Sequence, residues 1–132
     1  MFSYSGADTD TTRVKQVTNL CRTDIIKAAV QTVRGGGENN LHSHPRRDQI
    51  FFVLGGRLRF YTTDDEVVAE VGRHEGILVP RGYPYWFESV GDEVLELLQV
   101  AAADAPTKLT GPFGGRSNHA ARVNGRAEDR LV

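Results

Sequence analysis

The sequence lacks the features that mark several common protein classes. It has 132 residues and a single cysteine, Cys21, so no internal disulfide can form and a reducing compartment, the cytoplasm, is expected. The longest apolar run, residues 50–54, is far too short to span a bilayer. The N-terminal residues lack the apolar stretch of a signal peptide, so none is expected. Basic and acidic residues nearly balance, at 16 against 17, so no charge surplus predicts nucleic-acid binding. We expect neither a membrane nor a nucleic-acid partner.

Common catalytic motifs are missing as well. There is no Gly-x-Ser-x-Gly nucleophile elbow and no Gly-x-x-x-x-Gly-Lys phosphate loop. One cysteine cannot build a zinc site from thiolates, and we interpret Cys21 as a small packed residue. The glycine run at 35–37 is interpreted as a turn between strands.

The sequence does contain short apolar stretches separated by glycine, proline and aspartate. A recurrence about every 8–12 residues predicts an antiparallel barrel or sandwich of roughly eight strands. Residues 25–33 also suit a short helix, but their alternation and the glycines that follow favour a strand. The predicted strands cover residues 25–33, 50–54, 58–61, 67–71, 77–79, 85–87 and 94–100.

The chain is long enough for one domain with its own core. We place this domain at residues 14–103, after a mobile N-terminal segment at 1–13. Residues 104–132 carry few large apolar side chains, so this tail is either disordered or packed on the barrel or on a partner. Residues 14–21 can form a strand that pairs with a second copy, and we expect a homodimer.

Two histidines precede the apolar stretch at 50–54. Residues i and i+2 of a strand face the same side, so His42 and His44 can direct both imidazoles at one metal ion. Pro45 follows at once, where a strand turns or ends. This spacing makes the two histidines the leading candidates for a metal or substrate site.

The stretch resembles the first sequence motif of the cupin superfamily. That motif is Gly, five residues, His-x-His, three or four residues, Glu, six residues and Gly. Its positions are held here by Gly36, His42, His44, Gln49 and Gly56. The resemblance, which covers roughly residues 25–100, implies a small bacterial cupin, an all-β antiparallel barrel also called a double-stranded β-helix or jelly roll.

The second cupin motif is matched at its centre. It reads Gly, five residues, Pro-x-Gly, two residues, His, three residues and Asn, and residues 80–82 supply Pro-x-Gly. Tyr85 holds the His position, Ser89 the Asn position and His74 the Gly position. The sequence around both motifs is similar to that of small bacterial cupins in which Tyr replaces the second-motif His.

The resemblance implies one divalent metal, held by His42, His44, Gln49 and Tyr85. Gln49 offers only a neutral carbonyl oxygen, and Tyr85 must lose a proton with an unperturbed pKa of about 10. Alternatively, Gln49 orients a histidine and Tyr85 lines a pocket without a metal bond. Tyr85 is also a candidate general acid or base. Asp48 is a spare carboxylate, but alternation turns it away from the face of Gln49.

Several neighbours are predicted to line a substrate pocket. Alternation points Phe51 and Phe87 inward, and Phe60, Arg34 and Asn40 complete the predicted pocket. Arg46 and Arg47 are interpreted as a solvated turn, and His74 as a loop histidine.

Three functions remain open. The first is a metal-dependent, oxygenase-type enzyme acting on a small, aromatic or enolic metabolite, with Fe(II) favoured over Zn, Ni or Mn. The second is a non-redox metal-dependent cyclase or isomerase, as in polyketide pathways. The third is a binding or sensing module without catalysis, because the family's Glu and third His are missing.

Overall fold

The computed structural model describes residues 1–6, 14–35, 40–106 and 117–118, and its strands confirm the all-β prediction. Gly36, most of the predicted N-terminal segment and most of the predicted tail lie outside these residues. In this described part of the chain the strands are β1 (Lys15–Arg22), β2 (Ile26–Val33), β3 (His42–Ser43), β4 (Arg47–Gly55), β5 (Leu58–Tyr61), β6 (Val67–Val71), β7 (Gly76–Val79), β8 (Trp86–Ser89), β9 (Leu95–Ala103) and β10 (Ser117–Asn118). A short 3₁₀ turn at Thr63–Asp65 joins β5 to β6.

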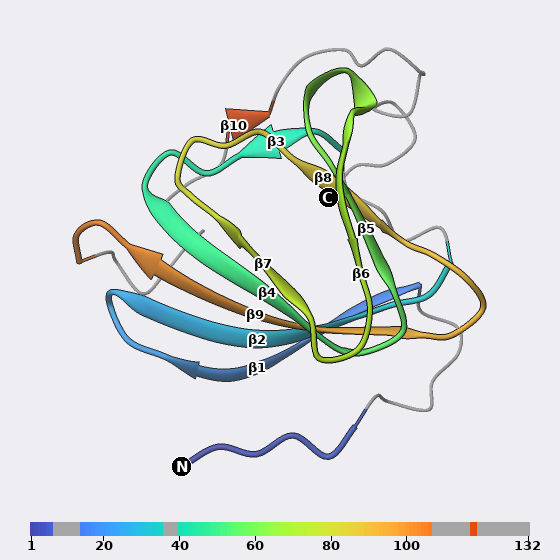
Figure 1. Cartoon of the computed structure of the whole chain (residues 1–132). Helices are drawn as coiled ribbons and strands as arrows, with labels where there is room; N and C mark the ends of the chain where they lie inside the picture. Colours follow the sequence, from blue (N-terminus) through green and yellow to red (C-terminus); the bar gives the residue numbers. More distant parts are fainter. Residues whose placement is uncertain (7–13, 36–39, 107–116, 119–132) are drawn as a thin grey trace.

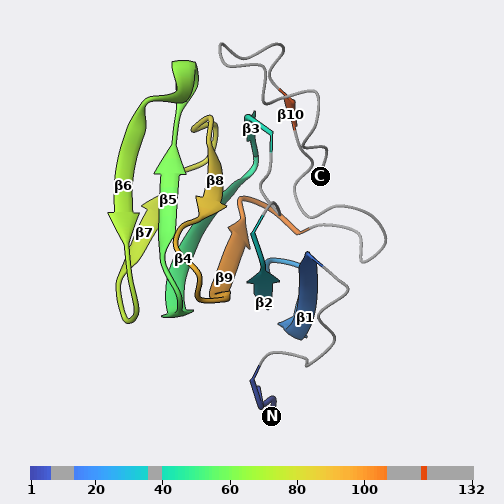
Figure 2. The ribbon, with the colours of Figure 1, turned by 90° about the vertical axis from the view of Figure 1, so that its right-hand side faces the viewer.

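Two antiparallel sheets form the walls of the barrel. The larger sheet has the order β1-β2-β9-β4-β7, and the smaller has the order β6-β5-β8 (Figure 1). Strands far apart in the sequence are neighbours, because β9 lies between β2 and β4. The edge-on view in Figure 2 shows the smaller sheet beside the curved larger one. The short pair β3 and β10 lies at one end of this arrangement (Figure 1).

The ambiguous stretch at 25–33 is a strand, not a helix. β2 pairs with β1 on one side and with β9 on the other, over its whole length. Its last six residues are all buried, so the two faces of this strand are both covered. A strand covered on both faces need not alternate strictly between apolar and polar residues.

The core lies between the two sheets. Strand alternation separates it from the outer surface: Phe51 is 1% exposed, whereas its neighbour Ile50 is 43% exposed. The largest cluster of buried side chains contains Val33, Phe51, Val53, Leu58, Phe60, Val79, Tyr85, Phe87, Leu95 and Leu97. The apolar floor of the barrel is therefore built from both walls.

The first strand belongs to the chain's own sheet. β1 pairs with β2 from Lys15 opposite Val33 to Arg22 opposite Lys27. A bulge between Asn19 and Cys21 shifts the alternation, and Cys21 is exposed, so the prediction of a packed cysteine was wrong.

The homodimer and the cytoplasmic location stay predictions. No helix in the described ranges is long and apolar enough to cross a bilayer.

Gly56, which ends the first motif, gives a test of the fold. Its φ is +79°, and a Cβ at this position would lie 2.6 Å from the Val94 carbonyl oxygen. A Cβ on the adjacent Gly55 would meet nothing within 4 Å. Because Ala is strained at positive φ and a backbone atom cannot yield cheaply, Gly56→Ala should lower the free energy of unfolding by about 2 kcal/mol or more. Gly55→Ala should change it by less than about 1 kcal/mol.

Urea denaturation of both variants measures the difference. Equal losses for Gly55→Ala and Gly56→Ala would contradict the close approach of the β4–β5 turn to β9.

Candidate functional site

The backbone brings the two sequence motifs together. His42 and Tyr85 form an antiparallel bridge, in which the His42 N–H donates to the Tyr85 carbonyl at 3.0 Å and the Tyr85 N–H donates to the His42 carbonyl at 2.8 Å. The Gly82 N–H also donates to the His44 carbonyl at 2.9 Å. The Pro-x-Gly turn is thus anchored to the His-x-His segment.

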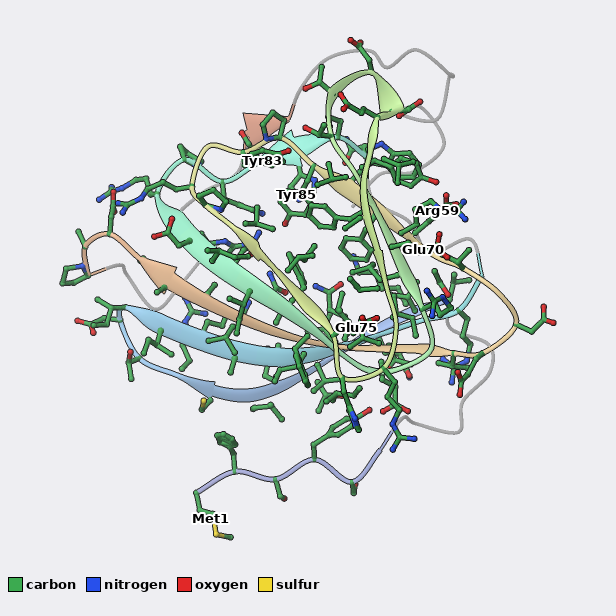
Figure 3. All side chains as sticks on the ribbon, in the orientation of Figure 1. Met1, Arg59, Glu70, Glu75, Tyr83 and Tyr85 are labelled. Carbon is green, nitrogen blue, oxygen red and sulfur yellow. The ribbon has the colours of Figure 1, made fainter. Side chains whose placement is uncertain are left out.

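Three predicted site residues converge in the interior. His42 and Tyr85 are each 2% exposed, and His44 is 8% exposed. The ring centre of His42 lies 4.4 Å from that of Tyr85 and 5.0 Å from that of His44. Figure 3 shows Tyr85 between the two sheets, whereas Arg59 and Glu70 lie on the outer side of the smaller sheet.

A backbone carbonyl orients His42. Its Nδ1 lies 2.7 Å from the carbonyl oxygen of Asn40, which can only accept a hydrogen bond. Nδ1 therefore carries the proton, and in the neutral ring Nε2 carries the lone pair. Metal-binding histidines are commonly held in this way by the ring nitrogen that faces away from the ion. Asn40, predicted as a pocket residue, thus has a positioning contact with the site.

A chain of amides supports Tyr85 from the larger sheet. Gln31 Nε2 donates to Gln99 Oε1 at 2.7 Å, and Gln99 Nε2 donates to Gln49 Oε1 at 2.8 Å. Gln49 Nε2 then donates to the Tyr85 hydroxyl oxygen at 2.7 Å. The relay crosses β2, β9 and β4 and ends on the phenol. Gln31 and Gln99 were not singled out from the sequence, because only the register of three strands brings them together.

The spare carboxylate is turned out of the site, as alternation predicted. Asp48 Oδ1 accepts from the Arg81 N–H at 2.8 Å and forms an ion pair with the Arg81 side chain at 3.5 Å. Gln49, its neighbour, is 2% exposed and faces the interior. Gln49, which holds the Glu position of the first motif, therefore faces the site, and Asp48 does not.

Arg47 is placed differently from its prediction. It begins β4, is half-buried, and its Nη2 lies 3.0 Å from Nε2 of His44. The prediction of a solvated turn was wrong for this residue, because the strand starts before the apolar run does. Since a guanidinium can only donate, His44 Nε2 is the acceptor.

A cavity of about 190 Å³ adjoins the rings. Its lining combines histidines, amides and basic side chains: Lys15, Val17, Lys27, Ala29, Gln31, His42, His44, Arg47, Tyr85 and Gln99. Lys15 and Lys27 carry no sequence signal for this position, because they stand on strands remote from both motifs. The cavity lies against the larger sheet.

The predicted pocket phenylalanines lie below this cavity, in the core. Phe60 stacks on Tyr85 with ring centres 5.0 Å apart, and Phe51 contacts Tyr85 at 5.8 Å. Phe87 packs against Phe51 at 5.7 Å. None of the three lines the cavity that adjoins the histidines, and neither does Arg34. The phenylalanines instead fix the position of the phenol.

The donor set can be compared with what a metal requires. Two imidazoles that share an ion at ~2.1 Å, with bond angles of ~90–110°, have ring centres roughly 4.5–5.2 Å apart. The 5.0 Å between His42 and His44 is compatible with this geometry. Among the described residues no group of three His, Cys, Asp or Glu side chains could hold a metal ion, so Tyr85 and Gln49 are the candidates for a third ligand beside the two histidines. Both amide ends of Gln49 are already hydrogen-bonded. The residues therefore fit an ion on His42, His44 and Tyr85, provided that Arg47 leaves His44.

The comparison with protein families settles the fold family. The family model described as a cupin domain matches residues 29–101, which is more than half of the chain. The chain belongs to the cupin family. The matched region contains both histidines, Gln49 and Tyr85, and it includes the second half of β2, all of β3 to β8 and most of β9.

Relatives of this cupin differ in length and similarity. Germin-like protein 3-8 of Oryza sativa subsp. japonica is 34% identical over 74 residues, which are 54% of this chain and 33% of the rice protein. The chain thus spans about a third of that relative. A Klebsiella pneumoniae protein with a double-stranded β-helix domain superposes with a TM-score of 0.69, at 16% identity and 89% coverage of both chains.

A second solved structure is oxalate oxidase in complex with the substrate analogue glycolate. It gives a TM-score of 0.61 at 22% identity, over 78% of this cupin and 58% of the oxidase chain. At such identities the two solved structures show the shared fold, and they confirm the cupin-type double-stranded β-helix predicted from the motifs.

The amide relay predicts coupled stabilities. Gln31→Met removes the donor to Gln99 Oε1, and Gln99→Met removes the acceptor of the buried Gln31 Nε2 and the donor to Gln49 Oε1, so each should lower the free energy of unfolding by about 1–3 kcal/mol. The double variant removes both partners of one hydrogen bond and should cost at least about 0.5 kcal/mol less than the sum. Chemical denaturation of the wild type, the two single variants and the double variant gives the coupling free energy between the two side chains. Strictly additive losses would contradict the hydrogen bond between the two amides.

Proposed function

We propose that this cupin holds one divalent transition metal on His42, His44 and Tyr85 and acts on a small metabolite in the adjoining cavity. The observation that supports it most is the convergence of the three buried rings, with His42 Nδ1 tied to the Asn40 carbonyl. An aromatic or enolic metabolite suits a cavity that borders a phenol and two imidazoles.

Fe(II) is the favoured ion, with Zn, Ni and Mn as alternatives. Two histidines, one oxygen ligand and open positions are typical of non-haem iron sites, and iron bound there would supply oxygen chemistry. An oxygenase-type reaction follows as the proposed activity. The named activity of the structurally similar oxalate oxidase is also a redox activity, which is compatible with this proposal.

The chain's own residues prepare the site for this role. The hydrogen bond that Gln49 donates to the Tyr85 oxygen stabilises the anionic phenolate, which is the form that binds a metal. Phe51 and Phe60 pack against the Tyr85 ring and keep it from rotating away. Asn40 keeps the His42 Nε2 lone pair directed away from the backbone.

A second candidate function is a binding or sensing module without catalysis. The contact of the Arg47 guanidinium with His44 Nε2 favours it, because this contact uses the lone pair that a metal needs. In this alternative His42, His44 and Tyr85 hold the ligand by hydrogen bonds alone.

Tyr85 as a ligand can be tested by spectroscopy. A phenolate bound to ferric iron gives an intense visible charge-transfer band, and we expect this band when the protein is loaded with iron and oxidised in air. Tyr85→Phe should lose the band but keep the fold, since the phenyl ring retains its packing against Phe60. Tyr83→Phe is the matched control and should keep the band. A band that persists in Tyr85→Phe would rule out the phenol as a ligand.

Arg47 should compete with the metal. Arg47→Met removes a positive charge and a charge-assisted hydrogen bond from His44, so the affinity for Zn²⁺ should rise by about tenfold or more. Arg46→Met is the control, because Arg46 is exposed and faces Asp104 at 3.1 Å. Calorimetric titration with Zn²⁺ measures both variants. An unchanged or weaker affinity in Arg47→Met would contradict the competition and favour the metal-free alternative.

A further inference from the structure

The cavity beside the rings is lined by three basic side chains from three different strands. Lys15 comes from β1, Lys27 from β2 and Arg47 from β4. No Asp or Glu is among the described residues that line it. The remaining polar lining consists of the two histidines, two amides and the Tyr85 hydroxyl. The described wall of this cavity is therefore positively charged.

Strand register places Lys27 near one end of the sheet's inner face, whereas Lys15 on β1 lies opposite Val33, towards the other end. Lys27 lies opposite Ala101 on β9, and Ala101 lies opposite Gln49 on β4, so Lys27 and Gln49 stand at the same level. Arg47 is two residues before Gln49 and shares its face, one level nearer the strand's start. Phe51, two residues further, belongs to the apolar core. Along β4 this face thus changes from a cation through an amide to an apolar side chain.

Lys27 lies close to other positive charges. The pKa of Lys27 is lowered by burial first, and then by the positive charges of Arg47 and Arg22. An anion between Lys27 and Arg47 would lower the energy of both charges, because opposite charges attract strongly in a partly buried site.

We propose that this cavity binds the anionic oxygen group, a carboxylate or a phosphate, of a small acid. Lys27 and Arg47 supply the charge, and Gln99 and Tyr85 stand within the same lining as hydrogen-bonding groups. The guanidinium of Arg47 can bind two oxygens of such a group side by side. This inference rests on the proposed function in that it names the substrate class of the same cavity. Anion binding needs no metal, however, so it can be tested independently of metal binding.

The rest of the lining restricts the size and polarity of the ligand beyond its anionic group. Val17, Ala29 and the Tyr85 ring supply apolar contacts beside the charged groups. A volume of about 190 Å³ admits a compact acid rather than a long chain. Benzoate and phenyl phosphate are suitable probes of this shape, and benzamide is the neutral counterpart of benzoate.

The test titrates these three probes into the full chain in the presence of a metal chelator. Wild-type protein should bind benzoate or phenyl phosphate at least tenfold more tightly than benzamide. Lys27→Met should weaken anion binding by about tenfold or more and leave benzamide unchanged, since it removes one charged contact. Arg73→Met removes one charge from the exposed turn before β7 and should leave all three affinities unchanged. Whichever of benzoate and phenyl phosphate binds more tightly shows whether the cavity prefers a carboxylate or a phosphate.

Thermal unfolding without ligand separates lost binding from lost structure. Lys27→Met should unfold at the same or a higher temperature than wild type, because it relieves repulsion by Arg47 and Arg22. Equal affinity for benzamide and both anions, or unchanged anion affinity in a folded Lys27→Met protein, would overturn the anion site even where a metal binds. Lys27-dependent anion binding under chelator would establish the site even where the metal assignment fails.

Discussion

The paired backbone hydrogen bonds between His42 and Tyr85 are the contact on which the candidate site depends. They join the His-x-His segment of the first sequence motif to the Tyr85 position of the second, so that both motifs contribute rings to one interior point. β3 is only two residues long and pairs otherwise with β10, so this bridge supplies much of what holds the histidine segment against the barrel. Without it, nothing in the motif spacing would place a phenol beside two imidazoles.

The barrel interior is organised in layers above an apolar floor. Tyr85 rests on Phe60 and Phe51, and the amide relay reaches its oxygen from the side. Lys27 and Arg47 lie at the same end of the larger sheet as Gln49, and both line the cavity. This order follows from antiparallel register, because cross-strand neighbours on one face stand at the same level of the sheet. A metal and an acidic ligand would accordingly meet at the boundary between the polar and the apolar layers.

Local sequence rules predicted the parts of this structure that depend on one strand at a time. The inward Gln49 and outward Asp48 followed from alternation, and residues 25–33 were correctly interpreted as a strand. His74, which stands where the family has glycine, has a φ of +67°, so the backbone explains why a glycine is usual there. Each of these features can be predicted from the alternation within one strand or from the backbone conformation of one turn.

Features that join several strands were not predictable in the same way. Lys15, Lys27, Gln31 and Gln99 reach the site only because β1, β2 and β9 pair in one register, which no local pattern fixes. Arg47 was assigned to a turn because the apolar run starts at Ile50, whereas pairing with β9 extends the strand back to Arg47. Cys21 was misplaced for a related reason, since a bulge that the sequence does not mark changes which side chains face outward.

The most direct test of the account is elemental analysis of the full chain, purified untagged and without chelator, beside the His42→Ala/His44→Ala double variant. The account predicts close to one equivalent of a transition metal, with iron favoured, and its loss in the folded double variant. A wild-type protein that stays free of metal even after metals are offered in excess would contradict the proposed metal-dependent function.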